Sequence, residues 1–228
     1  MNQIPSSSPS RLTVYEQCPL RAWLQFGKKI PDPTPKPAAD RGTAMHKMAE
    51  DFVRGKQTGS FPYELGKFKE EFHVLRTLFL NGQASLEGEW GYDQEWTATE
   101  WKSAWLRLKL DAIVHVSETE AIVIDYKSGK RFGNEIKHGE QLMFYAAATA
   151  SRFPLIQSIH TELWYLDIDE VAYAHYTREA AMRALARFHT RLEKMTKPQI
   201  YQPNPNIFSC KYCPYGSWGT GHCKAGKK

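Results

Sequence analysis

Ile122-Val123-Ile124-Asp125-Tyr126-Lys127-Ser128 is the stretch that decides the fold expected for this chain of 228 residues. Its apolar start is typical of a buried strand, and side chains two positions apart in a strand point to the same face. Asp125 and Lys127 are therefore expected to lie side by side. Asp111 ends an earlier segment in which leucine alternates with polar residues, the pattern of a second strand.

Two acids and a lysine on adjacent strands predict a compact site for a divalent cation. Carboxylates are the ligands that Mg²⁺ and Mn²⁺ prefer, and we expect Asp111, Asp125 and the main-chain carbonyl of Tyr126 to be ligands. Lys127 is expected to position or activate water and to offset anionic charge, which suits hydrolysis of a phosphodiester. The alternative is a surface salt bridge, because Asp-x-Lys triplets are common.

Three further motifs surround these strands. The segment 8–23 contains Ser-Pro-Ser-Arg-Leu and a Cys-Pro pair at Cys18, and the helical segment 41–50 contains Gly42-x-x-x-His46. Gln141 and Tyr145 are one turn apart on a later amphipathic helix, so both point the same way. A lone helical histidine or tyrosine is more often structural than functional, so the motifs count mainly in combination.

The order of these motifs resembles that of the PD-(D/E)xK nuclease superfamily, in particular RecB-like exonucleases with an iron–sulfur cluster, of the AddB-like and CRISPR-associated RecB-like types. The resemblance implies a metal-proximal role for His46. It also implies that Gln141 and Tyr145 contact the substrate backbone or Lys127. Two departures are Leu108, where related enzymes often have glycine, and a long spacing before the last cysteine.

The chain has four cysteines, namely Cys18, Cys210, Cys213 and Cys223. Four thiolates suit zinc as well as iron–sulfur, His222 is a further possible zinc ligand, and two disulfides are an alternative that a reducing compartment disfavours. The resemblance implies that the four thiolates bind a 4Fe–4S cluster. Residues 214–222 are glycine-rich, and we expect a flexible loop there to absorb the extra length.

Composition is ordinary for a soluble globular protein, with 42% hydrophobic and 24% charged residues. No apolar run is long enough to span a bilayer, and the polar N-terminal segment does not look like a signal peptide. We therefore expect a cytoplasmic protein that does not bind membranes. Residues 1–10 are polar and are expected to be loosely ordered.

Positive charge is concentrated late in the sequence. The net charge is +5, and residues 183–228 hold nine Lys or Arg against one acid. Arg183, Arg187, Arg191 and Lys194 share one face of the expected helix 177–197. The plain alternative is a solvated helix face, but beside a nuclease-like site this stripe favours contact with a phosphate backbone.

The sequence predicts an α/β fold with a PD-(D/E)xK restriction-endonuclease-like core, in which helices flank a mixed central sheet and a Cys₄ cluster joins the N- and C-terminal segments. Helices are expected at 11–27, 41–54, 67–81, 135–153 and 177–197, and strands at 86–96, 105–116, 121–127, 159–166 and 171–176. We expect one nuclease domain over residues 1–228. It comprises a cluster segment and Pro-rich linker (1–37), the core (38–197) and a cysteine segment (198–228).

The function expected from the resemblance is a metal-dependent DNA exonuclease with a structural 4Fe–4S cluster, acting in recombination, repair or phage DNA processing. A helicase or recombination protein is a possible partner, since the chain has no P-loop motif. The alternative is a non-catalytic nucleic-acid-binding module with a structural zinc or iron–sulfur site.

Overall fold

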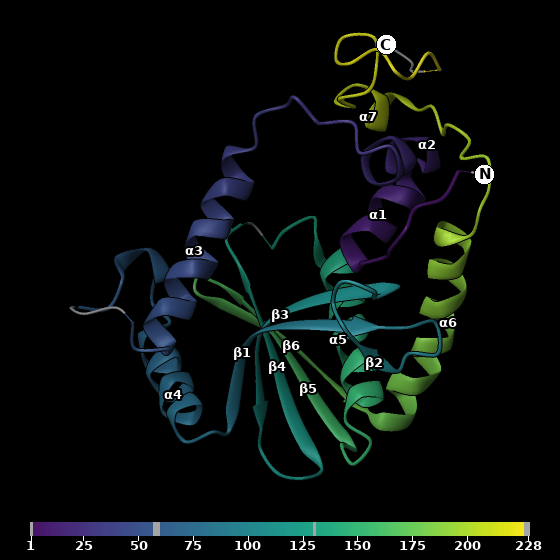
Figure 1. Cartoon of the computed structure of the whole chain (residues 1–228). Coiled ribbons are helices and arrows are strands. Elements are labelled where there is room, and N and C mark those ends of the chain that lie inside the picture. The colour runs from purple at the N-terminus through teal and green to yellow at the C-terminus, as the bar shows by residue number, and fades with distance from the viewer. Residues whose placement is uncertain (1, 57–59, 130, 226–228) are drawn as a thin grey trace.

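The protein is described by a computed structural model that covers residues 2–56, 60–129 and 131–225. Residues 1, 57–59, 130 and 226–228 lie outside the described residues, and they include the first residue of the polar N-terminal segment and Lys227 and Lys228 of the basic segment. A six-stranded mixed sheet with the order β2-β1-β3-β4-β5-β6 forms the centre, and helices pack on both of its faces (Figure 1). The strands are β1 (Ala84–Tyr92), β2 (Ala98–Thr99), β3 (Leu106–His115), β4 (Glu120–Lys127), β5 (Ser158–Tyr165) and β6 (Glu170–Thr177). This arrangement confirms the predicted fold class.

β4 and β5 form the parallel pair of this sheet, whereas the other neighbouring strands are antiparallel. The parallel pairing follows from the long crossover helix between them, α5 (Glu135–Arg152), because parallel neighbours cannot be joined by a tight turn. The same connection carries α5 past the end of β4, and this places the motif of Gln141 and Tyr145 next to Asp125.

Two hydrophobic cores lie on opposite faces of the sheet. On one face, α5 and α6 (Arg178–Thr196) pack through buried side chains such as Phe144 and Phe188. On the other face, α3 (Pro37–Val53) and α4 (Lys69–Leu80) pack through Met45 and Phe72. These helices have apolar stripes at helical spacing, so burial of one face explains each of them.

The expected helices and strands agree with the observed ones to within a few residues, except near the start of the chain, and β2 has no counterpart among the expected strands. The helix expected at 11–27 is interrupted at Cys18, because Pro19 cannot continue the hydrogen-bond ladder of the preceding helix, and its last part is a π-helical turn. α3 begins at Pro37, earlier than expected, since proline fits the first turn of a helix. The remaining helical segments are α1 (Pro9–Gln17), α2 (Pro19–Ala22), the π-helical turn η1 (Trp23–Gly27), the short 3₁₀ helix η2 (Tyr63–Leu65) and α7 (Ile207–Cys210).

The expectation of a loosely ordered N-terminal segment is wrong for the residues that are described. Ile4 and Ser7 are fully buried. Ser7 bridges to the start of β3, with its N–H 2.6 Å from the carbonyl of Trp105 and its carbonyl accepting the N–H of Arg107 at 2.9 Å. A polar segment can be buried in this way because the strand beside it satisfies its main-chain groups.

β3 and β4 form a fork. They pair over Ala112–His115 and Ala121–Ile124, and beyond this stretch β3 continues beside β1. Asp111 lies on β3 at the point where the strands separate, and Asp125 is the first residue of β4 beyond the paired stretch. The topology therefore brings both predicted acids to the opening of the fork.

Candidate active site

Asp111 is held at the fork by contacts from two directions. Its Oδ2 accepts a hydrogen bond from the main-chain N–H of Tyr126 at 2.6 Å, and its Oδ1 lies 2.7 Å from Nδ1 of His46. The carboxylate thus links β3, β4 and α3. Burial raises the pKa of Asp111 and repulsion from Asp125 adds to this, whereas His46 and the Tyr126 amide act in the opposite direction.

Asp125 and Lys127 lie on the same face of β4, as their spacing predicts. Lys127 Nζ is 2.5 Å from Asp125 Oδ2, and the carboxylate is almost completely buried. This contact has the distance of an ion pair, yet Oδ2 accepts no hydrogen bond of acceptable geometry from the residues that the structure describes. A buried carboxylate oxygen that accepts no hydrogen bond can still bind a cation or accept a donor.

α5 brings Gln141 and Tyr145 to the same carboxylate. The Tyr145 hydroxyl donates to Asp125 Oδ1 at 2.7 Å, and Gln141 Nε2 donates to the Tyr145 oxygen at 2.6 Å. Gln141 also accepts from Lys127 Nζ at 3.0 Å. Burial raises the pKa of Tyr145 and the charge of Asp125 adds to it, so the hydroxyl remains protonated and is a permanent donor to that carboxylate.

His46 approaches from α3, on the opposite face of the sheet. Burial alone would lower the pKa of His46, but the hydrogen bond and negative charge of Asp111 outweigh it and raise the pKa. Gly42 lies one turn earlier, and a Cβ there would be 2.9 Å from Ser128 Oγ. The glycine of the Gly42-x-x-x-His46 motif therefore lets α3 approach the end of β4.

These contacts place the five predicted side chains around Asp125 in one connected site: Asp111, Lys127, His46, Gln141 and Tyr145. The donor set fits Mg²⁺ or Mn²⁺ through its two buried carboxylates and the hydrogen-bonding capacity left on Asp125. No group of three or more His, Cys, Asp or Glu residues stands in metal-binding arrangement within the described ranges. The ligand set proposed below therefore relies on two carboxylates and a main-chain carbonyl.

The sequence interpretation did not identify His138. It lies at the start of α5, one turn before Gln141, with Nδ1 2.6 Å from the hydroxyl of Tyr165. Burial lowers the pKa of His138, and the positive charge of Lys127 lowers it further. His138 is three residues before Gln141, so the helical period places both side chains on one face of α5. This spacing is the sequence feature by which His138 could have been identified.

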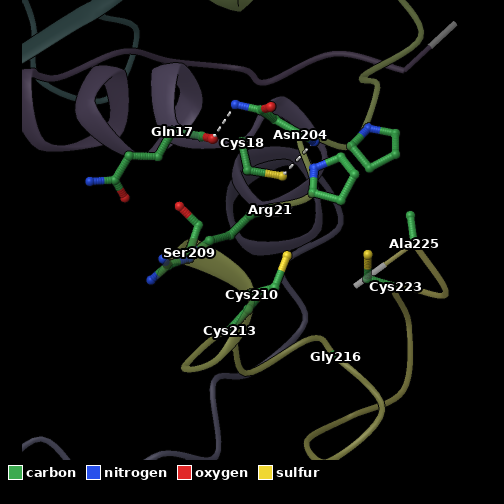
Figure 2. Close-up of a pocket in the computed structure, with 12 residues that line it drawn as sticks. Gln17, Cys18, Arg21, Asn204, Ser209, Cys210, Cys213, Gly216, Cys223 and Ala225 are labelled. Atoms are coloured by element: carbon green, nitrogen blue, oxygen red, sulfur yellow. Dashed lines mark hydrogen bonds between the residues drawn. The ribbon is translucent and has the colours of Figure 1, made fainter. Parts of the chain in front are cut away.

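The four cysteines, which come from distant parts of the sequence, line one pocket next to α2 (Figure 2). None of them forms a disulfide. Burial raises the pKa of Cys213, with further contributions from the neighbouring Cys18 and Cys223. The main-chain N–H of Asn204 points to Cys18 Sγ at 3.4 Å, a donor that suits a thiolate. His222 instead lies beside Thr220, with Nδ1 2.8 Å from its hydroxyl.

The long spacing between Cys213 and Cys223 is accommodated by a folded turn. Thr220 donates to the carbonyl of Pro214 at 2.8 Å, and Cys223 donates to that of Tyr215 at 2.7 Å. A Cβ on Gly219 would be 2.0 Å from the Pro214 oxygen, so the turn needs glycine there. The turn returns the chain to the pocket, which Cys223 lines together with the other three cysteines, although in the described ranges the four sulfurs do not stand in a metal-binding arrangement.

The basic stripe on α6 is partly neutralised. Arg191 pairs with Glu16 of α1 at 2.7 Å and also with Glu140 of α5, and Arg183 pairs with Glu179. Arg191 therefore joins three helices, and its guanidinium is occupied within the protein. The stripe therefore has less uncompensated charge than the sequence indicates, and its contact with a phosphate backbone stays a prediction.

In structure the chain is similar to SSO0001, with 17% identity, a TM-score of 0.45, and coverage of 100% of this chain and 90% of that one. It is also similar to an alkaline exonuclease from Laribacter hongkongensis, with 14% identity, a TM-score of 0.35, and coverage of 85% and 87%. No curated protein matches in sequence. No helix in the described ranges has the length and apolar character needed to cross a membrane. The PD-(D/E)XK nuclease superfamily matches residues 6–218, almost the whole chain, and the protein belongs to that superfamily.

Proposed function

We propose that this nuclease is a metal-dependent DNA exonuclease, which hydrolyses phosphodiester bonds at DNA ends. Asp111, Asp125 and the carbonyl of Tyr126 would hold Mg²⁺ or Mn²⁺, with His46 beside them. The bound cation would supply Lewis acidity to the scissile phosphate and lower the pKa of water.

The side chains around the cation have separate tasks in this proposal. Lys127 positions the attacking water and offsets the charge that develops on the phosphate. Gln141 fixes the ammonium of Lys127 through the 3.0 Å hydrogen bond, and Tyr145 fixes Asp125 through the 2.7 Å bond. His46 holds Asp111 from α3. Each group is thus oriented before substrate arrives, which reduces the reorganisation needed during reaction.

The observation that carries this proposal is the ring of contacts Lys127–Asp125–Tyr145–Gln141, which closes on Lys127. A surface salt bridge would be exposed, whereas Asp125 is 5% exposed and Asp111 is 9% exposed. Burial of two carboxylates is costly without a cation, and this favours a functional reason for keeping them together.

We further propose that Cys18, Cys210, Cys213 and Cys223 bind a 4Fe–4S cluster with a structural role. The shared pocket and the absence of disulfides among these four support thiolate ligands. The resemblance to RecB-like nucleases favours iron–sulfur over zinc. The cluster would join residues 1–37 and 198–228 to the core 38–197, so that the chain acts as one nuclease domain.

Work at DNA ends in recombination, repair or phage DNA processing would fit this activity. A helicase or recombination protein is the partner class that we propose, because the sequence has no P-loop motif with which to drive unwinding of DNA.

The test is degradation of linear single- and double-stranded DNA that carries a label at one end or the other. We expect loss of label with Mn²⁺ or Mg²⁺, no loss with chelator, and little or no loss with Lys127→Ala. The label that disappears first gives the polarity. Iron and sulfide analysis of the same preparation tests the cluster.

Lys67→Ala is a suitable control for removal of a cation, since Lys67 lies before α4 and pairs with Asp169 at the surface. If protein that is fully loaded with its metal binds DNA but does not cleave it, the exonuclease proposal is wrong. Internal cleavage of a circular substrate would make the enzyme an endonuclease.

A further inference from the structure

A second cavity adjoins the candidate active site and is not explained by hydrolysis. It measures about 340 Å³ and lies between the N-terminal segment and the start of β3. Gln141 and Tyr145 line it, and both belong to the hydrogen-bonded ring around Asp125. Trp101, from the loop between β2 and β3, lines it as well. We call it the Trp101 cavity.

The walls of the Trp101 cavity are held firmly. Ser7 and Ser8 belong to the segment that pairs with the start of β3, through the bonds of Ser7 to Trp105 and Arg107. Arg107 donates to the carbonyl of Lys102 at 2.8 Å, which fixes the loop that carries Trp101. The cavity is therefore built before any ligand arrives.

The charge of the Trp101 cavity is positive. Arg11, Arg107 and Lys109 line it, and among the residues that the structure describes no aspartate or glutamate does. Lys109 has an ion pair with Glu89, which does not line the cavity. Burial lowers the pKa of Arg11, and the charge of Arg107 lowers it further, so the two guanidinium groups repel each other. An anion placed between them would relieve this repulsion.

Trp101 adds an aromatic surface to this positive wall. The Arg107 guanidinium carbon is 5.4 Å from the centroid of its ring, and Lys109 Nζ is 5.8 Å away. An aromatic ring flanked by cations is the combination by which proteins stack an unpaired base and hold its phosphates. A cavity of about 340 Å³ is near the lower end of the range for small ligands, which suits one nucleotide better than a base pair.

A neighbouring cavity shows where such a nucleotide would stand relative to the reaction. That cavity contains Lys127 and shares Gln141, Pro9 and Ser10 with the Trp101 cavity. A strand that crosses both would pass Gln141 and present one phosphate to Lys127. The nucleotide in the Trp101 cavity would then adjoin the scissile bond.

We propose that the Trp101 cavity is a nucleotide subsite, in which an unpaired base next to the scissile phosphate stacks on Trp101 while Arg11 and Arg107 hold the flanking phosphate. The proposal rests on the nuclease function proposed above. Because a base inside a duplex is already stacked on its neighbours, and the cavity has room for one nucleotide, the subsite selects a frayed or single-stranded end. The competing explanation is that Trp101 only packs against the stems of Arg107 and Lys109.

The test uses full-length protein with Lys127→Ala, which keeps DNA intact, and single-stranded oligonucleotides with one abasic position moved along the strand. With Trp101 present, one abasic position should weaken binding about tenfold, the usual size of one base–aromatic stack. With Trp101→Ala added, the intact strand should bind about tenfold more weakly. An abasic site at that same position should then weaken binding no more than an abasic site at any other position.

Two variants serve as controls. Trp101→Phe keeps an aromatic face and should retain most of the affinity and the abasic profile. Tyr173→Ala removes an aromatic side chain that is 80% exposed on β6. It should leave both the affinity and the abasic profile unchanged.

An unchanged abasic profile in Trp101→Ala would overturn the subsite, whether or not overall binding weakens. Cleavage of DNA by the unaltered protein, together with that result, would show that only the subsite is wrong. Failure of the unaltered protein both to bind and to cut DNA would overturn the proposed function and the subsite together.

Discussion

His46 Nδ1 and Asp111 Oδ1 are 2.7 Å apart, and this contact joins a helix on one face of the sheet to the strand that carries the first acid. α3 also approaches β4 closely at Gly42 and Ser128. The position of α3 is thus coupled to the geometry of the fork. Changes in α3 are expected to reach the active site although most of the helix lies outside it.

The first prediction concerns pH and the stability that His46 contributes in metal-free protein. The pKa of His46 is raised above its ordinary value of 6.5 in the folded state, so its contribution is fully present below 6.5 and is lost as pH rises through the folded-state pKa. Metal-free wild type should melt about 3 °C above His46→Gln at pH 6. This difference should disappear towards pH 9. A constant difference across the range, measured by calorimetry, would contradict a titrating contact.

The second prediction concerns the Tyr145 hydroxyl. Tyr145→Phe removes a buried donor to Asp125 while keeping the ring, so the free energy of unfolding should fall by about 1–3 kcal/mol. Urea unfolding measures the loss. Cleavage should also slow, because Asp125 and Gln141 lose a shared partner. Tyr176→Phe is the control, since Tyr176 is part-buried on β6, away from Asp125. Normal stability and rate in Tyr145→Phe would exclude the hydrogen bond as an organising contact.

The third prediction tests the close approach of α3. Gly42→Ala would place a methyl group 2.9 Å from Ser128 Oγ, so either that hydroxyl or α3, which carries His46, must shift. We expect slower cleavage and a higher Mn²⁺ requirement in this variant. Adding Ser128→Gly should restore both, because it removes the obstructing oxygen. Lack of rescue in the double variant would mean that crowding at Ser128 is not the cause.

The fourth prediction separates structural arginines from DNA-binding ones on α6. Arg191→Gln should lower the free energy of unfolding by about 1 kcal/mol, since its ion pairs with Glu16 and Glu140 are partly exposed and screened. It should hardly change the salt dependence of DNA binding. Arg187→Gln is the matched variant, on the same face and exposed, and should have the smaller effect on stability. The reverse pattern would restore the complete stripe as a DNA surface.

The fifth prediction concerns the last cysteine. Cys223→Ala should lose iron to the same extent as Cys18→Ala, because the turn after Cys213 brings Cys223 into the shared pocket. Gly219→Ala should also lose iron, since a Cβ would collide with the Pro214 carbonyl and open the turn. Iron and sulfide content and visible absorption measure the loss. Full iron content in Cys223→Ala would show that another group is the fourth ligand.

The sequence was sufficient for most elements because their signals are local. Alternation around Leu108 and the apolar run before Asp125 indicate strands, and helical spacing indicates α5 and α6. The pairing of Asp125 with Lys127 follows from the two-residue period of a strand. The approach of His46 from the opposite face does not, because it depends on the fork between β3 and β4.

What the sequence did not reveal depends on partners far along the chain. Ser7 is buried because Trp105 and Arg107 satisfy its main-chain groups, and a polar sequence alone does not predict such burial. Arg191 has helical spacing with its neighbours on α6, yet its acids come from α1 and α5. The glycines before Cys223 predicted a flexible loop from composition alone. In the structure, Gly219 instead allows a close approach to the Pro214 carbonyl within a folded turn.

The buried N-terminal segment also has a consequence for how the protein folds. Ile4 donates to the hydroxyl of Tyr201 across 197 residues, one of the longest sequence separations bridged by a hydrogen bond in this molecule. Contacts between residues so far apart in the sequence close the largest loops, and they tend to form after local structure. We therefore expect the sheet and its four long helices to assemble first, with the segment around Ile4 docking late. Maturation of the Trp101 cavity would then lag behind acquisition of secondary structure during refolding.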